Sequence, residues 1–395
     1  MRVVLAGASG AIGRHLVPQL LEAKHEVIGI TRTAGSLAGT GAREVVADVL
    51  DRPAFLAALD GIKADVVIHQ LTALSKAPAR SRDMRETNRL RTEGTSTLIA
   101  AARKVGAKKF VAASFFGGYG LADHGRTPVL ESDPFGELDG RADAVQTALL
   151  SLEQQVRAFG GVTLRFGLFY DSTTTSVSPV SSTWNGVLPM LHVSDAAAAT
   201  VRCLVKYKAG AIYNIADDRP LTYRAREIAR ASAARLRPPA RLPDGMLRLA
   251  APFGALLLTA TSIRVDTSKA HTELGWTPQY PSLLEHLVSG ASARADLVIP
   301  TAVATPVPKP EPVPEPEPVS EAEPVPEAES EPKAEPEPVP VVVEKSKPKP
   351  KQKPRSTGRP RSPAASTKPT KPTDPGDLFQ DTDAAIARIG VWRDE

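Results

Sequence analysis

The sequence predicts an α/β fold of the Rossmann type, a doubly wound parallel sheet with helices on both faces. Three observations support this prediction: apolar runs alternate with helical patterns, the runs lack polar alternation, and a glycine-rich turn follows the first run. Unbroken Val- and Ile-rich strands are typical of parallel sheets that are buried on both faces. Strands that alternate with helices are joined by right-handed crossovers, so a ligand is expected at the carboxyl ends of the strands.

Six apolar runs are predicted to form the strands of this sheet, at residues 2–7, 26–31, 44–48, 65–70, 108–114 and 161–166. Helical periodicity fills the segments between them, at residues 11–23, 52–60, 86–106 and 143–156. Pro18 lies inside the first helical pattern, where proline is expected to kink the helix. A further helix, strand and helix are expected in 191–229, and residues 267–287 close the ordered part.

Composition divides the chain into an ordered domain and a tail. Residues 1–295 are predicted to form the dinucleotide-binding domain, whose small substrate-binding part lies mainly in 167–192 and 218–295. Residues 296–375 are rich in Pro and Glu and then in Lys and Arg, so they are expected to be disordered. Residues 376–395 regain apolar side chains, and a short C-terminal helical motif is expected there.

The tail is strongly polarised in charge. Residues 311–344 carry eleven Glu and one Lys, whereas 345–371 carry ten Lys or Arg and no acid. Three roles remain open for it: a solvated spacer, an electrostatic tether to an acidic partner or nucleic acid, and self-association of the opposite blocks. A protein or acidic partner is therefore expected through 345–395, and nucleic acid only through the basic part.

The single cysteine, Cys203, excludes an intramolecular disulfide bond and fits a reducing compartment. It lies in a helical pattern and is expected to be a buried, small apolar residue. No run is long enough to cross a bilayer, because the apolar run at 247–261 is short and contains Pro252. We therefore expect a cytoplasmic protein with no membrane partner, and no Cys/His cluster indicates a metal site.

Glycines stand at positions 7, 10 and 13, between the first predicted strand and the first predicted helix. Gly7 permits a tight turn, Gly10 lets the backbone approach a pyrophosphate, and Gly13 lets the helix pack closely on the strand. The helix N-terminus adds free N–H groups and a positive dipole. This pattern predicts a dinucleotide site; a tight turn with only a structural role is the alternative.

The end of the second strand bears on which dinucleotide binds. An acidic residue there would hold the adenosine ribose, but the strand ends in Thr31 and Arg32. A guanidinium suits a 2′-phosphate, so NADP(H) is favoured over NAD(H). Arg32 could equally be a solvated loop charge. Asp48, after the third strand, is a candidate for contacting the adenine.

These segments together resemble the extended short-chain dehydrogenase/reductase family, in its NAD-dependent epimerase/dehydratase branch. The motifs that carry the resemblance are GASGAIG (7–13), VADV around Asp48, VVIHQLTAL (66–74), TNRLRTEGT, FVAASFFGGYG (110–120), LRFGLFY (164–170), HVSDAAAA (192–199) and ELGWTPQY (273–280). They lie in order over residues 1–290. The resemblance implies cofactor contacts from Gly7, Ser9, Gly10, Ala11, Ile12, Gly13, Arg32, Asp48, Val49, Leu71, Thr72 and Asn88.

The resemblance fails at the residues that transfer protons. The family usually has Tyr-x-x-x-Lys followed four residues later by Glu; aligned on Glu153, the two positions fall on Val145 and Leu149. The position of the family's catalytic serine falls on Phe115. Valine and leucine cannot exchange a proton, and general acid–base catalysis typically supplies roughly 100- to 10,000-fold in rate.

Other groups could act in place of the missing pair, although the catalytic residues themselves are not identified. The weak candidates are Ser114, Tyr119, Tyr170 and His192, which lie at or after predicted strand ends. Each has an alternative structural role as a hydrogen-bonding, wall or capping residue. His69 is expected to be packed and hydrogen-bonded, and Asp195 is expected to be a helix N-cap.

Two functions remain open on the sequence alone. The first is an NAD(P)-binding oxidoreductase or epimerase/dehydratase of atypical chemistry that acts on a small carbonyl or hydroxyl substrate. The segment between Tyr170 and His192 lacks basic residues, which argues against a nucleotide sugar. The second is a catalytically weak or inactive sensor or scaffold, which binds a dinucleotide and recruits a partner through its charged tail and terminal helix.

Overall fold

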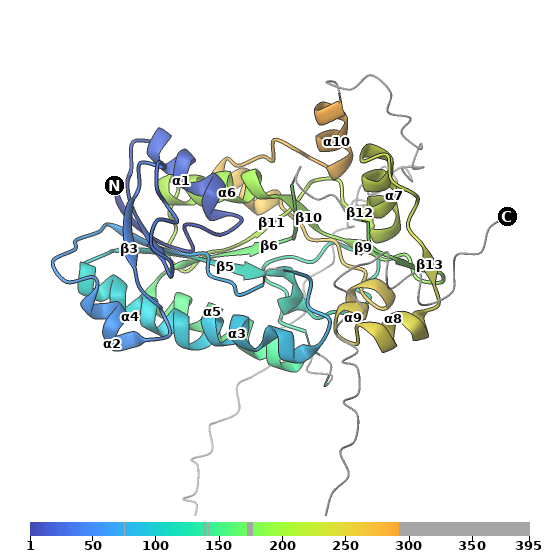
Figure 1. Ribbon diagram of the computed structural model, residues 1–395, viewed down its shortest axis with the longest axis horizontal. Helices are drawn as coiled ribbons and strands as arrows, with labels where there is room; N and C mark the ends of the chain where they lie inside the picture. The colour runs from blue at the N-terminus through green and yellow to red at the C-terminus, as the bar shows by residue number, and fades with distance from the viewer. Residues whose placement is uncertain (75, 137–139, 141, 172–176, 292–395) are drawn as a thin grey trace, which may run out of the picture. The chain divides into compact units, whose positions relative to one another are not determined.

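The largest sheet in the described part of the chain has seven parallel strands in the order β11-β6-β5-β4-β1-β2-β3 (Figure 1). The computed structural model describes residues 1–74, 76–136, 140, 142–171 and 177–291. The strands are β1 Arg2–Ala6, β2 Glu26–Thr31, β3 Arg43–Val46, β4 Val66–His69, β5 Lys109–Phe115, β6 Val162–Phe166 and β11 Ile212–Ile215. The strand order reverses between β1 and β4, which is where such a sheet opens a crevice for ligands.

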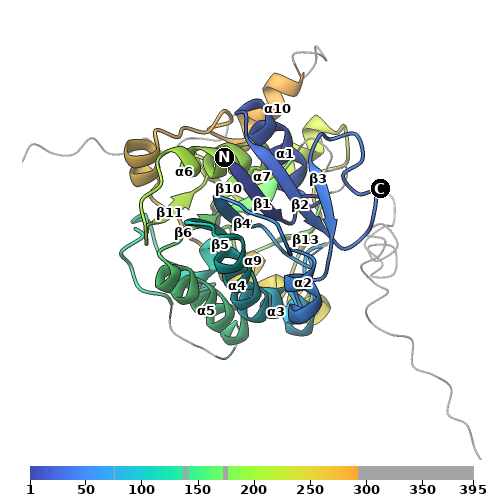
Figure 2. The same ribbon diagram turned by 90° about the vertical axis from the view of Figure 1, so that its left-hand side faces the viewer.

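Helices cover both faces of this sheet (Figure 2). On one side lie α1 Gly13–Glu22 and α6 Val193–Val205, and on the other lie α2 Arg52–Ala57, α4 Thr95–Val105 and α5 Asp143–Phe159. The expected helix at 86–106 is continuous but changes type, in the order η1 Ser81–Met84, α3 Arg85–Arg89, the π-helical turn η2 Leu90–Gly94 and α4. Such π turns often occur at functional sites.

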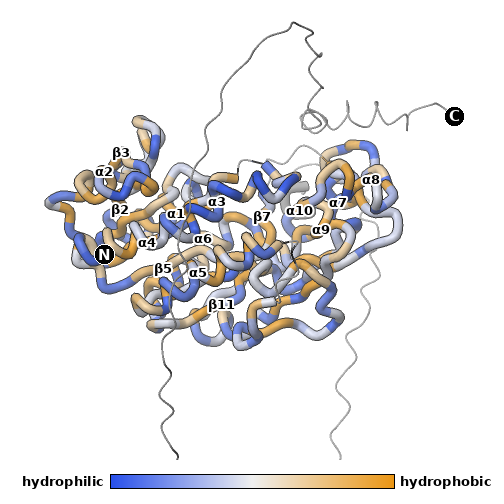
Figure 3. Tube along the Cα trace, turned by 90° about the horizontal axis from the view of Figure 1, so that it is seen from below, coloured by the Kyte–Doolittle hydropathy of each residue, from blue (hydrophilic) through white to orange (hydrophobic). Residues whose placement is uncertain are grey.

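The alternation of side chains along β1 explains why both faces need cover. Val3 and Leu5 belong to the core beneath α1 and α6, whereas Val4 and Ala6 belong to the core on the opposite face. Figure 3 shows hydrophobic and hydrophilic stretches interspersed along the trace. Cys203 is fully buried in the first of these cores, as the sequence predicted.

The second half of the described chain adds short strands and helices beside the carboxyl end of the sheet (Figure 1). Three two-stranded sheets pair β7 with β10, β9 with β12, and β8 with β13. Their strands are β7 Leu168–Tyr170, β8 Val180–Ser181, β9 Val187–Leu188, β10 Met190–His192, β12 Leu221–Thr222 and β13 Arg241–Leu242. The helices here are α7 Tyr223–Ala233, α8 Asp244–Ala250, α9 Gly254–Thr259 and α10 Leu283–Ala291; η3 Phe116–Tyr119 and the π turn η4 Ala270–Leu274 complete the elements.

The predicted α/β fold is confirmed, and all six predicted strands begin and end within two residues of those observed. Helix α1 continues through Pro18 to Glu22. The predicted linker at 296–375 and the predicted motif at 376–395 lie outside the described residues. Among the described helices, none is both long and apolar enough to cross a lipid bilayer.

Candidate functional site

The turn between β1 and α1 depends on two glycines. Gly7 has a φ of 94°, a conformation that residues with a Cβ rarely adopt. A Cβ on Gly13 would lie 2.2 Å from the carbonyl oxygen of Gly7 and 2.3 Å from that of Ala8. A Cβ on Gly10 would meet only the Gly7 oxygen, at 3.2 Å. The tight turn and the close helix packing predicted for Gly7 and Gly13 are therefore present.

The same turn exposes backbone donors. Ser9, Gly10 and Ala11 are exposed, whereas the side chain of Ile12 is buried in the core. The Gly10 N–H donates to the Gly7 carbonyl at 3.1 Å, but no described residue accepts a hydrogen bond from the N–H groups of Ala11, Ile12 or Gly13. The first turn of α1 contains no acidic side chain. Free N–H groups at a helix N-terminus form an anion-binding site, so this turn fits a pyrophosphate.

The loop after β2 carries the exposed guanidinium of Arg32 and lies against the Glu44 carboxylate, which is already hydrogen-bonded. Arg32 is exposed and has no acidic partner among the described residues. The Glu44 carboxylate accepts hydrogen bonds from the Thr31 hydroxyl at 3.1 Å and from the N–H groups of Gly35 and Leu37 at 2.7 and 3.1 Å. These hydrogen bonds, that of Gly35 above all, lower the pKa of Glu44. Glu44 thus organises the loop, and Arg32 is the side chain that remains open to a ligand.

The residues after β3 divide into an exposed and a buried position. Asp48 is exposed, and its carboxylate accepts a hydrogen bond from the Leu50 N–H at 2.9 Å. Val49 is buried in the core on the α4 side of the sheet. The backbone and the Asp48 carboxylate, but not the Val49 side chain, can therefore face a ligand at this edge.

The loop after β4 lies against the glycine turn, since a Cβ on Gly7 would lie 2.8 Å from the Gln70 carbonyl oxygen. The Leu71 N–H donates to Nδ1 of His69 at 3.2 Å. Burial lowers the pKa of His69 to about 4, so the ring is neutral and packed, as the sequence predicted. Thr72 is exposed, and its hydroxyl accepts a hydrogen bond from the Leu74 N–H.

Asn88 lies on α3 and has its side chain engaged by a neighbour. Its Oδ1 accepts a hydrogen bond from Nη1 of Arg91 at 3.2 Å. The structure thus places the glycine turn against the loop after β4, and that loop against α3 through the hydrogen bond from the Ala73 N–H to the Thr87 hydroxyl. It also adds Arg91, which sequence reasoning missed; the only signal for it was a basic residue on the same helical face as Asn88.

Ser114, the first weak catalytic candidate, belongs to a buried ionic network. Its hydroxyl donates to Oε1 of Glu153 at 2.7 Å. The Glu153 carboxylate also accepts two hydrogen bonds from the Arg165 guanidinium, at 3.0 and 2.8 Å, and all three side chains are buried. The network joins β5, α5 and β6. The Ser114 hydroxyl is therefore held in a structural hydrogen bond. This is the role expected for it as the alternative to catalysis.

The hydroxyl groups of Tyr119 and Tyr170 are also held in buried hydrogen bonds. The Tyr119 hydroxyl donates to Oδ1 of Asn214 at 2.7 Å, and burial raises its pKa to about 12. The Tyr170 hydroxyl donates to Oδ2 of Asp217 at 2.9 Å, and burial also raises the Tyr170 pKa. Asp217 is buried, and desolvation raises the pKa of its carboxyl to about 7. Neither phenol is placed to lose its proton near neutral pH.

His192 caps α6, which corrects an expectation about Asp195. The imidazole Nδ1 accepts a hydrogen bond from the Ser194 N–H at 3.3 Å, so His192 is the N-cap. The Asp195 carboxylate instead accepts hydrogen bonds from the N–H groups of Gln279 and Tyr280, both at 3.0 Å. The N-cap expectation for Asp195 was wrong because its partners lie more than 80 residues away in the sequence.

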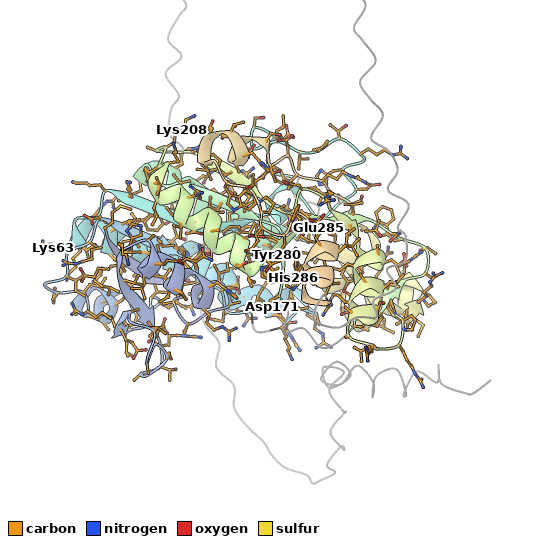
Figure 4. All side chains as sticks on the ribbon, turned by 90° about the horizontal axis from the view of Figure 1, so that it is seen from above. Lys63, Asp171, Lys208, Tyr280, Glu285 and His286 are labelled. Atoms are coloured by element: carbon orange, nitrogen blue, oxygen red, sulfur yellow. The ribbon has the colours of Figure 1, made fainter. Side chains whose placement is uncertain are left out.

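The ring of His192 belongs to a cluster of aromatic and imidazole rings. Its centroid lies 4.5 Å from those of Tyr280 and His286 and 5.3 Å from that of Tyr170. Figure 4 labels Tyr280, His286 and Asp171 in the same part of the molecule, and the ring centroids of Tyr280 and His286 lie 4.7 Å apart. Burial and the neighbouring imidazoles lower the pKa of His192 to about 4, so this ring is neutral at physiological pH.

An apolar cluster occupies the place where the resemblance would put the proton-transferring pair. Val145 and Leu149 are both buried on α5. The members of this cluster, hereafter the α5 cluster, are Met84, Ala142, Val145, Leu149 and Phe253, with Phe115, Leu121, Phe135 and Leu256 packed against them. None of the six tyrosines in the chain is followed four residues later by a lysine.

Comparison with known proteins agrees with this fold and glycine turn. Residues 3–160 match the model of the NAD-dependent epimerase/dehydratase family. The chain is also 35% identical over 311 residues to a 3-diazoavenalumate denitrifying reductase from a Streptomyces species, covering 71% of this chain and 97% of that protein. The chain belongs to the NAD-dependent epimerase/dehydratase family. The family model covers α5 as well as the glycine turn, so Val145 and Leu149 lie within the matched region.

Solved structures support the same architecture. A UDP-glucose 4-epimerase from Thermotoga maritima, solved with UDP-glucose, superposes with a TM-score of 0.60 at 19% identity, covering 73% of this chain and 96% of the epimerase. A UDP-glucose 4-epimerase from Thermus thermophilus, solved with NAD, gives a TM-score of 0.60 at 20% identity over the same shares. At these identities the similarity establishes the fold alone.

Proposed function

We propose that the protein is an NAD(P)H-dependent reductase whose acceptor takes up a hydride without a proton from a protein side chain. The observation that carries the proposal is the contrast between the open glycine turn and the α5 cluster, which places Val145 and Leu149 where acid–base residues would lie. Ser114, Tyr119 and Tyr170 each donate their proton to a buried acceptor. An acceptor that needed a proton would therefore find no free donor among these groups.

The residues present fit a nicotinamide dinucleotide. The free N–H groups of Ala11, Ile12 and Gly13 would hold the pyrophosphate. Gly13 lets the helix begin close against the turn, where a Cβ would overlap the carbonyl oxygens of Gly7 and Ala8. We propose NADP(H) over NAD(H), because Arg32 is open to a 2′-phosphate while the Glu44 carboxylate is held by its own loop. When bound, the reduced dinucleotide supplies a hydride.

The substrate class we propose is an arenediazonium carboxylate. The Streptomyces relative is named as a denitrifying reductase of a diazo compound, 3-diazoavenalumate. An arenediazonium cation that accepts a hydride at its terminal nitrogen becomes a neutral aryldiazene, Ar–N=N–H. Loss of N₂ then breaks the C–N bond and leaves the hydrogen on the ring carbon. One hydride enters, ArH and N₂ leave, and no external proton is needed.

The α5 cluster suits such a substrate in two ways. Its partly buried members Phe115 and Phe135 would offer aromatic contact to a flat ring. The buried members of the cluster would keep water from this side of the ring, and closed apolar sites prevent hydrolysis of reactive species. Water would otherwise replace N₂ and convert the diazonium into a phenol. The chain's own contribution is thus to bind, to orient and to keep the site dry.

The test uses the full chain, [4,4-²H₂]NADPH and 4-carboxybenzenediazonium, with 4-carboxybenzaldehyde as the matched carbonyl. We expect one N₂ and one ring deuterium for each NADPH oxidised, at a rate above that without protein. The aldehyde should react at least ~100-fold more slowly, because its alkoxide needs a proton. Faster reduction of the aldehyde, or a phenol as the enzymatic product, would contradict the proposal. NADPH binding without turnover of either compound would favour a sensor or scaffold.

A further inference from the structure

The guanidinium of Arg91 is partly buried at the cofactor edge and lacks an acidic partner. Arg91 lies in the π turn η2, in the helical segment that also carries Thr87 and Asn88. Its Nη1 donates to the side-chain carbonyl of Asn88 at 3.2 Å, and no carboxylate of a described residue lies within ion-pair distance. Burial alone accounts for the lowered pKa of Arg91, about 10. A desolvated charge that has only a neutral partner is costly to the fold.

The neighbouring acids are already used by another arginine. Arg89 pairs with Glu86 at 3.3 Å and with Glu93 at 3.0 Å on the exposed side of the same helix. Glu93 is only two residues from Arg91 in sequence, yet its carboxylate pairs with Arg89. The lack of an acid at Arg91 is therefore a property of its helical face.

The position of Arg91 indicates where its ligand would come from. Thr87, one turn earlier, accepts a hydrogen bond from the Ala73 N–H at 3.1 Å, so this face of the helix lies against the loop after β4. Arg91 is also close enough to His69, the last residue of β4, for its charge to lower the pKa of that ring. The helix packs against α5, since the Gln155 side chain donates to the Thr92 carbonyl.

We propose that Arg91 binds an oxyanion at the cofactor edge, either a phosphate of the dinucleotide or the carboxylate of the substrate. The inference rests on the proposed function for the identity of these two ligands. A guanidinium matches both groups, because its planar N–H donors can bond two oxygens at once. The Asn88 carbonyl would then hold the guanidinium in place while the remaining N–H groups face the ligand.

The experiment measures binding and stability in the full chain, without turnover. Dissociation constants for NADPH, and for 4-carboxycinnamate against its dimethyl ester in the presence of NADP⁺, are compared in wild type, Arg91→Gln and Arg91→Lys. Arg89→Gln serves as the matched control, because Arg89 is an exposed arginine on the same helix. We expect Arg91→Gln to weaken one of the two anions about 10- to 100-fold, the range for hydrogen bonds to charged groups. Arg89→Gln should leave both constants unchanged.

The binding and melting measurements distinguish three roles for Arg91: contact with the dinucleotide, contact with the substrate carboxylate, and a purely structural role. Weaker NADPH binding with unchanged carboxylate binding identifies the dinucleotide, and the reverse identifies the substrate; in the second case the dimethyl ester should bind equally to wild type and variant. The ligand-free melting temperature of Arg91→Gln should not fall, because the variant removes an unpaired charge. Should Arg91→Gln not fold, Arg91→Lys keeps the charge, loses the planar fork and is expected to show a smaller loss in the same arm. Unchanged binding of both anions in the folded variants would overturn the inference, and failure to reduce a diazonium would not affect it.

Discussion

The two ends of the ligand-binding edge differ in what their polar groups are free to do. At the glycine turn, N–H groups and the Arg32 side chain have no internal acceptor or acid among the described residues. Around β5, α5 and β7, by contrast, Ser114, Tyr119 and Tyr170 are each bonded to a buried side chain. The polar groups of the first region are free to meet a ligand, whereas the polar groups of the second are held by the fold. Binding of the coenzyme and transfer of protons are therefore separable properties of this fold.

The largest effect is expected at the centre of the stable region, from Glu153→Ala. The variant leaves the Arg165 guanidinium buried without its carboxylate and takes away the acceptor of Ser114. We expect a loss of about 3–5 kcal/mol in the free energy of unfolding, measured by urea titration. Ser114→Ala removes one hydrogen bond and should cost only about 1–3 kcal/mol. Equal losses in the two variants would show that the ion pair contributes nothing beyond the Ser114 bond.

The next effect depends on pH and comes from Asp217→Asn. Because the folded-state pKa of Asp217 is raised to about 7, its contribution to stability is complete below pH ~4 and is lost as the pH rises through 7. Asparagine does not titrate and can still accept the Tyr170 hydroxyl. The stability of the variant relative to wild type should therefore rise by on the order of 3 kcal/mol between pH 4 and pH 8. Parallel stability curves for the two proteins would exclude a raised pKa.

The open region is tested by Gly13→Ala. The added methyl group would overlap the carbonyl oxygens of Gly7 and Ala8, which are backbone atoms of the turn itself. Overpacking of about 1–3 kcal/mol corresponds to a roughly 5- to 150-fold weaker binding of NADPH, measured by calorimetry. Gly10→Ala is the matched control and should have a smaller effect, since its Cβ would meet only one oxygen, at 3.2 Å. A reversed ranking of the two variants would mean that the turn moves on binding.

A smaller change is expected from Arg32→Ser, which sharpens the choice between the two coenzymes. The variant removes an exposed guanidinium and leaves the Glu44 network intact. We expect NADPH to bind roughly tenfold more weakly and NADH to bind unchanged, because only NADPH carries the 2′-phosphate. An equal loss for both coenzymes would show that Arg32 does not recognise this phosphate.

The smallest effect should come from Tyr119→Phe. If the Tyr119 proton takes no part in the reaction, kcat for diazonium reduction should change by less than about threefold. A general acid would instead give roughly 100- to 10,000-fold. Steady-state measurement of kcat at pH 7 distinguishes the two outcomes. A loss within the larger range would show that Tyr119 donates a proton in the reaction.

Sequence reasoning succeeded where the controlling contacts are local. The strands follow from unbroken apolar runs, and the glycine turn follows from spacing within seven residues. It failed where the partner is distant: Asp195 bonds the backbone of Gln279 and Tyr280, and Ser114 bonds Glu153 across 39 residues. The six short strands outside the main sheet have only two or three residues each, too few for a periodic pattern.

Arg91 illustrates the same limit at the candidate site. Glu93 is two residues away in sequence, so nothing in the sequence indicates that Arg89 takes both nearby acids. Which face of a helix turns toward solvent is decided by packing, and the π turn shifts the register of the residues that follow it.

The ring cluster around His192 contributes to stability in a way that depends on pH. Its imidazole has a pKa of about 4 in place of 6.5, and His286, 4.5 Å away, is lowered in the same direction. The unfolded chain would take up protons at both sites below pH 6.5 while the native chain resists them. The contribution of these two imidazoles to stability therefore falls as the pH drops below 6.5, opposite in sign to that of Asp217. If the protein reduces arenediazonium ions as proposed, the reaction would have to be assayed near neutral pH, where both imidazoles keep their full contribution to stability.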